Sequence, residues 1–206
     1  MLQIWGRANS INVQKVMWTV AELGLEHVRH DAGGRHGGLD TVAFGQMNPH
    51  RRVPVIEDAG TVVWESHAIM RYLAAKYGAG SLWPEDPAAR AAADQWVEWA
   101  QSTLLPLFLH VFIAIAKTPP AKRNVQAIVN GAKRLQGLYR ILDNHLASRD
   151  FVAGDALTIA DIPAGATLYR CYSMDFPGRP GLPNVEAWHA RLRERPGFRE
   201  YVEVPW

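Results

Sequence analysis

The alternation of apolar and polar positions predicts strands and helices in the first part of the chain and helices alone in the rest. Short runs rich in β-branched or aromatic residues occupy residues 2–5, 26–30, 53–56 and 61–64. Apolar residues at helical spacing occur around residues 13–21, 40–46 and 69–77. The predicted order of elements is therefore βαβα followed by ββα, which is the order of a thioredoxin-like domain.

The second part of the chain shows only helical periodicity. Residues 78–87 are rich in glycine, proline and acidic side chains and have no period, which is typical of a linker. Helical patterns then cover residues 88–116, 121–147, 159–172 and 185–195. We therefore expect a first domain over residues 1–79, a linker over 80–87 and an all-helical domain over 88–206.

Length and charge narrow the possible functions. The chain has 206 residues, of which 48% are apolar and 20% charged, so it can build a sizeable core in one large or two unequal domains. The 22 basic and 20 acidic side chains leave a formal net charge of only +2. Because no large field of one sign is available to hold a polyanion, we do not expect a nucleic-acid partner.

Neither the start of the chain nor its most apolar run predicts export or a membrane span. Residues 1–5 lack the basic and long apolar regions of a secretory signal. The most apolar run, residues 104–116, contains Pro106 and His110 and is shorter than the roughly 20 residues that a span needs. We expect a cytoplasmic protein without a membrane partner.

Cys171 is the only cysteine. The chain therefore cannot form an intrachain disulfide, a CxxC redox pair or a zinc site of several cysteines. We expect no metal, and any thiol chemistry would use the thiol of another molecule.

The turn between the first strand and the first helix is the first candidate for chemistry. Its sequence over residues 6–12 is GRANSIN, which places small polar side chains beside the free N–H groups of a helix start. Such a place stabilises a thiolate and lowers a thiol pKa from about 8.5 to between ~3.5 and ~7.5. Ser10 could donate a hydrogen bond to a thiolate there, or it could serve only as a helix cap.

The second candidate is the segment Asn48-Pro49-His50-Arg51-Arg52-Val53-Pro54. Pro54 falls at the start of a strand, where a cis Val53–Pro54 bond is one solution. A cis bond would turn the Val53 backbone toward a pocket, where it could pair with an extended peptide ligand. Arg51 and Arg52 could then meet the ligand carboxylate, or could lie in an ordinary solvated loop.

The third candidate is the pair Glu65-Ser66 at the junction of a strand and a helix. The N–H groups at the helix start can hold an anion such as an α-carboxylate. Glu65 could neutralise a neighbouring ammonium group. The same two residue types are also common helix caps, so this pair alone does not decide between the two roles.

These three segments, in this order and followed by a helical half, resemble the cytosolic glutathione transferase family over essentially the whole chain. The resemblance implies a thioredoxin-like glutathione-binding domain joined to an all-helical domain. It implies that the first turn activates the glutathione thiol and that Pro54 is preceded by a cis bond. It also implies that Val53 pairs with the tripeptide and that Glu65-Ser66 bind its γ-glutamyl end.

The first turn also indicates the type of member. Ser10 matches the serine of theta-like members, and Ser10-x-Asn12-x-x-Lys15 is similar to the Thr-x-Asn-x-x-Lys pattern of bacterial nu-like members. The resemblance therefore implies that Ser10 activates the thiol, with Asn12 supporting or replacing it. Arg52 matches the residue that contacts the glycyl end of glutathione, and Arg51 is a close competitor.

The second substrate is expected to lie against apolar side chains of the helical half and the C-terminal tail. The candidates are Trp99, Leu105, Phe108, Phe112 and Trp206. Core packing explains such residues equally well.

The function implied by the resemblance is conjugation of the glutathione thiolate to small apolar electrophiles, in a detoxifying homodimer. One alternative is a glutathione-dependent disulfide reductase or peroxidase of the nu-like type. Isomerisation or dehalogenation through a glutathione adduct also stays open. A different class of protein, a binding module without catalysis, is possible because a fold does not fix a function.

Overall fold

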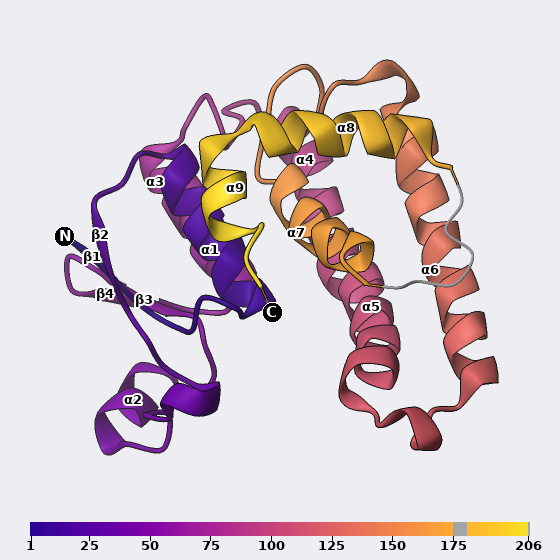
Figure 1. Cartoon of the computed structure of the whole chain (residues 1–206). Coiled ribbons are helices and arrows are strands. Elements are labelled where there is room, and N and C mark those ends of the chain that lie inside the picture. Colours follow the sequence, from indigo (N-terminus) through magenta and orange to yellow (C-terminus); the bar gives the residue numbers. More distant parts are fainter. Residues whose placement is uncertain (175–180, 206) are drawn as a thin grey trace. The chain divides into compact units, whose positions relative to one another are not determined.

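The computed structural model describes residues 1–174 and 181–205, and the chain forms two compact units (Figure 1). The first unit comprises Met1–Glu85 together with the C-terminal residues from Arg193 onward. The second unit comprises Asp86–Leu192.

The first unit contains a four-stranded mixed sheet in the order β2-β1-β3-β4. Its strands are β1 (Leu2–Trp5), β2 (His27–His30), β3 (Val55–Asp58) and β4 (Thr61–Trp64). β1 and β2 are parallel, whereas β1–β3 and β3–β4 are antiparallel. β3 lies two residues later than the run predicted at 53–56. The reason is the two-residue turn at Ala59 and Gly60, whose φ angles of 50° and 84° let the hairpin pair as far as Asp58 and Thr61.

Helices cover both faces of this sheet. One face carries α1 (Ile11–Glu22) and α3 (Ser66–Tyr77), which lie side by side in Figure 1. Their apolar positions form one core with the strands: Leu2, Ile4, Val13, Val16, Met17, Val20, Ile56, Ile69 and Leu73. The other face packs against α2 (Val42–Met47), mainly through Phe44. A short 3₁₀ turn, Gly34–His36, lies between β2 and α2. The predicted thioredoxin-like arrangement is thus confirmed.

The last helix, α9 (Pro196–Tyr201), packs against α1. The Trp18 and Phe198 rings meet edge to face at 4.9 Å. A Cβ atom on Gly197 would lie 2.8 Å from the Ala21 side chain, so glycine permits this close approach. The sequence analysis assigned residues 193–206 to the helical domain, and the structure instead places them with the first unit. The short helix was missed because its Pro196-Gly197 start looks like a break.

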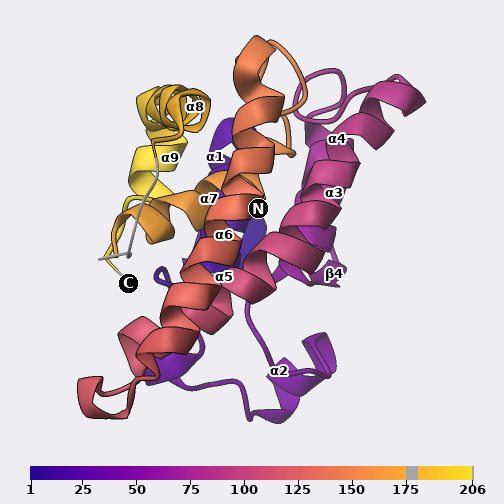
Figure 2. The same ribbon diagram turned by 90° about the vertical axis from the view of Figure 1, so that its right-hand side faces the viewer.

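The second unit is helical. Its helices are α4 (Pro87–Trp99), α5 (Leu105–Phe112), α6 (Val125–His145), α7 (Asp161–Tyr172) and α8 (Pro183–Glu194), the last of which extends just beyond the unit (Figure 2). A wider π-helical turn at Ala100–Leu104 joins α4 to α5, and a second one at Ile113–Lys117 extends the helical stretch beyond α5. Pro106 lies two residues after the first of these turns, and a proline cannot donate the backbone hydrogen bond of a regular helix.

The stretch Pro87–Lys117 is also the one helix among the described residues that is long and apolar enough to cross a bilayer. It has 31 residues, and the mean hydropathy of its most apolar window is 1.6. A core helix of a soluble protein meets the same criterion, so one such helix is weak evidence for a membrane span.

Asp161, which is fully buried at the start of α7, connects three parts of the helical unit. Its carboxylate accepts hydrogen bonds from the Thr158 backbone N–H at 3.0 Å, the Val152 backbone N–H at 2.8 Å and the Trp188 indole N–H at 2.8 Å. Because a buried carboxylate is stable only when its oxygens are bonded, these contacts fix the entry of the chain into α7.

A buried polar pair joins α1 to the first turn of α3. Lys15 is 1% exposed, and its Nζ lies 2.8 Å from the His67 Nε2. Burial lowers the pKa of Lys15 to about 7, and the Glu65 carboxylate opposes this shift. Burial first, and then the charges of Lys15 and Arg71, lower the pKa of His67 well below its usual 6.5. His67 is therefore a neutral acceptor for the Lys15 ammonium.

Because the pKa of Lys15 is lowered in the folded chain, we expect the free energy of unfolding to rise with pH. Between about pH 7 and 10.5 the unfolded chain holds a proton at Lys15 that the folded chain has released, so the free energy of unfolding increases by up to about 1.4 kcal/mol per pH unit. Urea unfolding followed by tryptophan fluorescence at several pH values in this window measures the slope. Lys15→Met should flatten it, whereas Lys133→Met, at an exposed lysine of α6, should not. An unchanged slope in Lys15→Met would contradict this assignment.

Candidate functional site

The turn between β1 and α1 is held by backbone hydrogen bonds to the end of β2. The Gly6 N–H donates to the His30 carbonyl at 2.9 Å, and the Arg7 N–H donates to the Ala32 carbonyl at 3.0 Å. Gly6 is required here because a Cβ atom would overlap the Val13 side chain. The chain then reaches Ser10, which has extended φ and ψ angles of −83° and 123° and stands at the N-cap position of α1.

Ser10 and Asn12 bring unpaired polar atoms to the start of α1. Ser10 is 8% exposed, and its hydroxyl makes no capping bond to the helix. The Asn12 Oδ1 is buried and has no hydrogen-bond partner among residues 1–174 and 181–205. The capping role that the sequence left open for Ser10 is therefore not used. Two polar side chains and the free N–H groups of the helix remain available to a ligand atom.

The Val53–Pro54 peptide bond is cis, as predicted. Asn48, which is 2% exposed, holds the segment before it: its Nδ2 donates to the Arg52 carbonyl at 2.9 Å, and its Oδ1 accepts from the His50 N–H at 2.9 Å. The pairing of β3 with β4 begins only at Val55. The backbone amide and carbonyl of Val53 therefore lie outside the sheet ladder, where an extended peptide can reach them.

The two neighbouring arginines have different surroundings. The Arg51 Nη1 donates to the carbonyls of Leu39 and Thr41, each at 2.8 Å, and its guanidinium lies against Gly45. Arg51 thus fixes the loop before α2. Arg52 is exposed, and its guanidinium has no hydrogen bond within the described part of the chain. Of the two predicted candidates, Arg52 is the one that is free to meet a carboxylate.

Glu65 and Ser66 form the start of α3. Glu65 has a φ angle of 70°, which costs a non-glycine residue about 1–3 kcal/mol and is found most often at functional sites. Its side chain is exposed, whereas Ser66 is 3% exposed at the first helical position. The Ser66 hydroxyl and the N–H groups of the first turn lie directly beside His67 of the buried pair.

The side chains predicted to contact the second substrate differ in how deeply they are buried. Phe108 is fully buried and its ring packs 5.6 Å from that of Phe112, so it belongs to the core of the helical unit. Leu105 and Phe112 are 7% and 8% exposed, and Trp99 is half-buried. Trp206 lies outside the described residues. Helical periodicity could not distinguish core residues from pocket residues among these positions, because both kinds are apolar.

A cavity of about 460 Å³ opens beside the Ser10 turn, within the first unit. Its lining residues are Arg7, Ala8, Asn9, Arg29, Asp31, Arg35, His36, Val204 and Pro205. The sequence analysis singled out none of them as site residues. The basic residues stand far apart along the chain and form no cluster that a sequence pattern would indicate.

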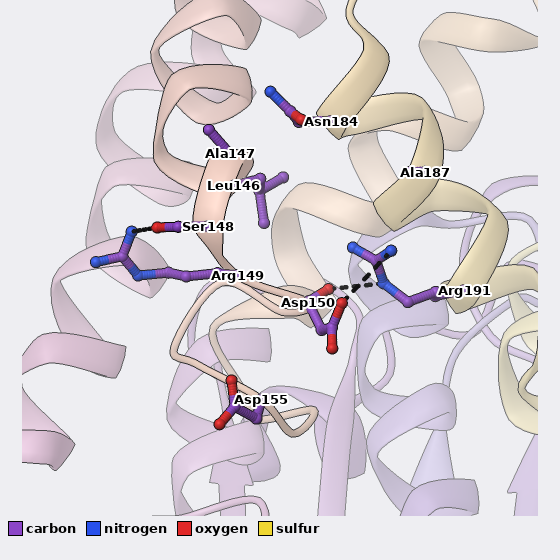
Figure 3. A pocket seen from close by; sticks show the side chains of 9 residues that line it. All are labelled: Leu146, Ala147, Ser148, Arg149, Asp150, Asp155, Asn184, Ala187 and Arg191. Atoms are coloured by element: carbon purple, nitrogen blue, oxygen red, sulfur yellow. Dashed lines mark hydrogen bonds and ion pairs between the residues drawn. The ribbon is translucent and has the colours of Figure 1, made fainter.

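The second unit has a cavity of about 310 Å³ between the end of α6 and α8 (Figure 3). It is lined by Leu146, Ala147, Ser148, Arg149, Asp150, Asp155, Asn184, Ala187 and Arg191. The Arg191 guanidinium pairs with Asp150 at 3.7 Å and donates to its carbonyl at 2.9 Å. None of the predicted site residues lines this cavity.

In residues 1–174 and 181–205, no three His, Cys, Asp or Glu side chains stand close enough together to hold a metal ion. Cys171 is buried, with its Sγ 3.4 Å from the Tyr139 hydroxyl.

Comparisons with known proteins agree with this arrangement. The family model described as glutathione S-transferase, N-terminal domain, matches residues 9–76, and the model for the C-terminal domain matches residues 104–196. The glutathione S-transferase GstB of Escherichia coli K12 is 37% identical over all of this chain and 99% of its own length.

Solved structures show the same similarity. A theta class glutathione S-transferase from Xanthomonas axonopodis pv. citri, with glutathione bound, superposes with a TM-score of 0.93 at 38% identity. The match covers 99% of this chain and 98% of that one. Isozyme E7 from Drosophila melanogaster gives a TM-score of 0.83 at 28% identity, over 98% and 91% of the two chains. The chain therefore belongs to the glutathione S-transferase family, which uses glutathione as its co-substrate.

Proposed function

We propose that this transferase ionises glutathione at Ser10 and Asn12 and conjugates the thiolate to a small electrophile. The observation that carries the proposal is the pair of polar side chains at the α1 N-terminus that make no bond to the protein's own helix. The Ser10 hydroxyl and the Asn12 Nδ2 amide group, rather than the unpaired Asn12 Oδ1, would donate to a sulfur anion, and the helix N-terminus favours negative charge. Together they would lower the pKa of the bound thiol toward neutral pH.

The remaining predicted residues suit the rest of the tripeptide. The start of α3 at Glu65-Ser66 offers N–H groups and a hydroxyl for the γ-glutamyl carboxylate, and the Glu65 carboxylate suits its ammonium. The Val53 backbone suits β-type pairing with the middle of the peptide. The free guanidinium of Arg52 suits the glycyl carboxylate, while Arg51 and Pro54 shape the segment.

In the proposed reaction the thiolate attacks an electrophilic carbon. A carbon–sulfur bond forms, the leaving group departs with its electron pair, and the thiol proton passes to solvent. The protein supplies orientation and electrostatic stabilisation, so it needs no nucleophile of its own. We further propose a detoxifying role in the cytoplasm and a homodimer, which sedimentation or light scattering can test.

Asn12 also favours a second reaction, glutathione-dependent disulfide reduction. Its unpaired Oδ1 lies in the first turn of α1, within the segment that resembles the nu-like pattern, and residues 6–12 contain no cysteine. Two glutathione molecules would reduce one disulfide to two thiols and leave as glutathione disulfide. Turnover of hydroxyethyl disulfide, compared with that of 1-chloro-2,4-dinitrobenzene, separates the two reactions. A non-catalytic module would be retained on immobilised glutathione and would turn over neither compound.

Removing either polar side chain at the α1 N-terminus should weaken thiol ionisation. Because a hydrogen bond to a charged group is worth about 1.5–3 kcal/mol, Ser10→Ala or Asn12→Ala should raise the pKa of bound glutathione thiol by about one to two units. An ultraviolet titration of the thiolate in the binary complex measures this pKa. Ser102→Ala, an exposed serine of the helical unit, is the matched control. If neither variant shifts the pKa, these residues do not activate the thiol.

The two arginines should differ in their effect on glutathione binding. Arg52→Ala should raise the Kd for glutathione about three- to tenfold, since it removes a partner of the glycyl carboxylate. It should leave the Kd unchanged for glutathione monoethyl ester, whose glycyl carboxyl is neutral. Arg51→Ala should instead lower stability, because the carbonyls of Leu39 and Thr41 lose their donor. Calorimetry with both ligands measures the contrast, and equal losses for glutathione and its ester would exclude the Arg52 assignment.

A further inference from the structure

The cavity beside the Ser10 turn borders the place where the proposed thiolate forms. Its wall contains Arg7, Ala8 and Asn9, which directly precede Ser10, and the Ser10 N–H donates to the Arg7 carbonyl at 3.1 Å. The opposite wall comes from the end of β2, the Gly34–His36 turn and the C-terminal tail. A volume of about 460 Å³ lies within the range of ligand pockets, roughly 300–1,000 Å³.

This cavity is separate from the proposed glutathione groove. Val53, Glu65 and Ser66, which suit the tripeptide, do not line it. Glutathione held in the groove would place its sulfur at Ser10, which directly follows the lining residue Asn9, without filling the cavity. A second molecule in the cavity would therefore meet the sulfur and would not compete with the tripeptide.

The cavity has an excess of positive charge. Its lining includes three arginines and one carboxylate, that of Asp31. Arg29 is already engaged: its Nη1 donates to the Gly6 carbonyl at 2.7 Å and to Asp31 at 2.5 Å. This hydrogen bond lowers the pKa of the Asp31 carboxyl, so the pair is ionised and nearly neutral in sum. The charges of Arg7 and Arg35 are not balanced by any other lining residue.

Arg7 and Arg35 keep donors free for a ligand. Arg7 has no side-chain hydrogen bond or ion pair within the described residues, and its stem lies over Gly34, where a Cβ atom would be 3.1 Å from the Arg7 Cδ. Arg35 donates only its Nε, to the His36 ring at 3.3 Å. Each guanidinium can therefore offer two parallel N–H groups, the geometry that matches a carboxylate or a phosphate.

We infer that this cavity binds the second substrate and that the substrate carries an anionic group, held by Arg7 and Arg35. The inference rests on the proposed function and names the substrate class for it. It also changes the expectation of an apolar electrophile, since the cavity beside the nucleophile is lined by cations.

A suitable reaction is aromatic substitution on an aryl chloride that bears a carboxylate. The glutathione sulfur forms a bond to the ring carbon, and the carbon–chlorine bond breaks with chloride taking the electron pair. The thiol proton goes to solvent, and the carboxylate stays unchanged on the ring at the arginines. No oxidant or reductant is needed.

The test compares 4-chloro-3-nitrobenzoate with the neutral isostere 4-chloro-3-nitrobenzamide. Each kcat/KM is divided by the rate constant of the uncatalysed reaction of the same compound with glutathione. The resulting enhancement does not depend on the intrinsic reactivity of the compound. The enhancement should be about tenfold larger for the benzoate at low ionic strength. Added potassium chloride should reduce this preference, because salt screens exposed charges.

Two variants locate the effect. Arg7→Gln and Arg35→Gln should each lower kcat/KM for the benzoate about three- to fivefold and leave that for the benzamide within about twofold. Continued turnover of the benzamide shows that each variant is folded. Arg134→Gln, at an exposed position of α6, removes the same charge outside the cavity and should change neither value.

The possible outcomes separate the two proposals. Turnover of the benzamide without any preference for the benzoate overturns the inference and leaves the proposed function standing. Equal losses for both compounds in Arg7→Gln and Arg35→Gln also overturn it, since they indicate a general structural role. No turnover of either compound, combined with no heat of glutathione binding at millimolar concentration, overturns both.

Discussion

The proposed chemistry depends on the parallel pairing of β1 with β2. This pairing brings the Gly6 and Arg7 amides onto carbonyls at the end of β2, and it thereby fixes where α1 starts. A helix N-terminus can stabilise an anion only if its N–H groups are held at a constant position. Because Gly6 lies against Val13, the turn is short and the helix begins directly after it. Ser10, Asn12 and the cationic cavity all take their positions from this turn.

The arginines near the proposed site are of two kinds. Some donate hydrogen bonds to the backbone, and others have a guanidinium without a partner among the described residues. Arg51 bonds the carbonyls before α2, whereas Arg52 has no partner among the described residues. In the cavity, Arg29 bonds a carbonyl and Asp31, whereas Arg7 keeps its guanidinium free. An arginine that is already saturated adds little to ligand binding, because its donors would have to be exchanged. The free arginines are therefore the ones proposed to hold the anionic groups of the substrates.

The core beneath the site contains a buried pair of polar side chains. Lys15 and His67 are buried together and connect α1 with the first turn of α3, the helix that begins at Glu65-Ser66. Their contact is stable because one group donates and the other, kept neutral by burial, accepts. The contact links α1, whose start is proposed to hold the sulfur of glutathione, to the start of α3, which is proposed to hold the γ-glutamyl end. It therefore fixes their separation more strictly than apolar packing alone would.

The sequence by itself determined most of the secondary-structure elements and the segments proposed to bind glutathione. Period and turn chemistry are local, so the four strands and the helix starts at Ser10 and Glu65-Ser66 could be predicted from short segments, whereas the cis bond before Pro54 was predicted from the family resemblance. Only the tertiary structure decided that Phe108 is core, that α9 packs on α1, and that Arg7, Arg29 and Arg35 line one cavity with the C-terminal tail. These facts depend on contacts between residues far apart in the chain, which no local period encodes.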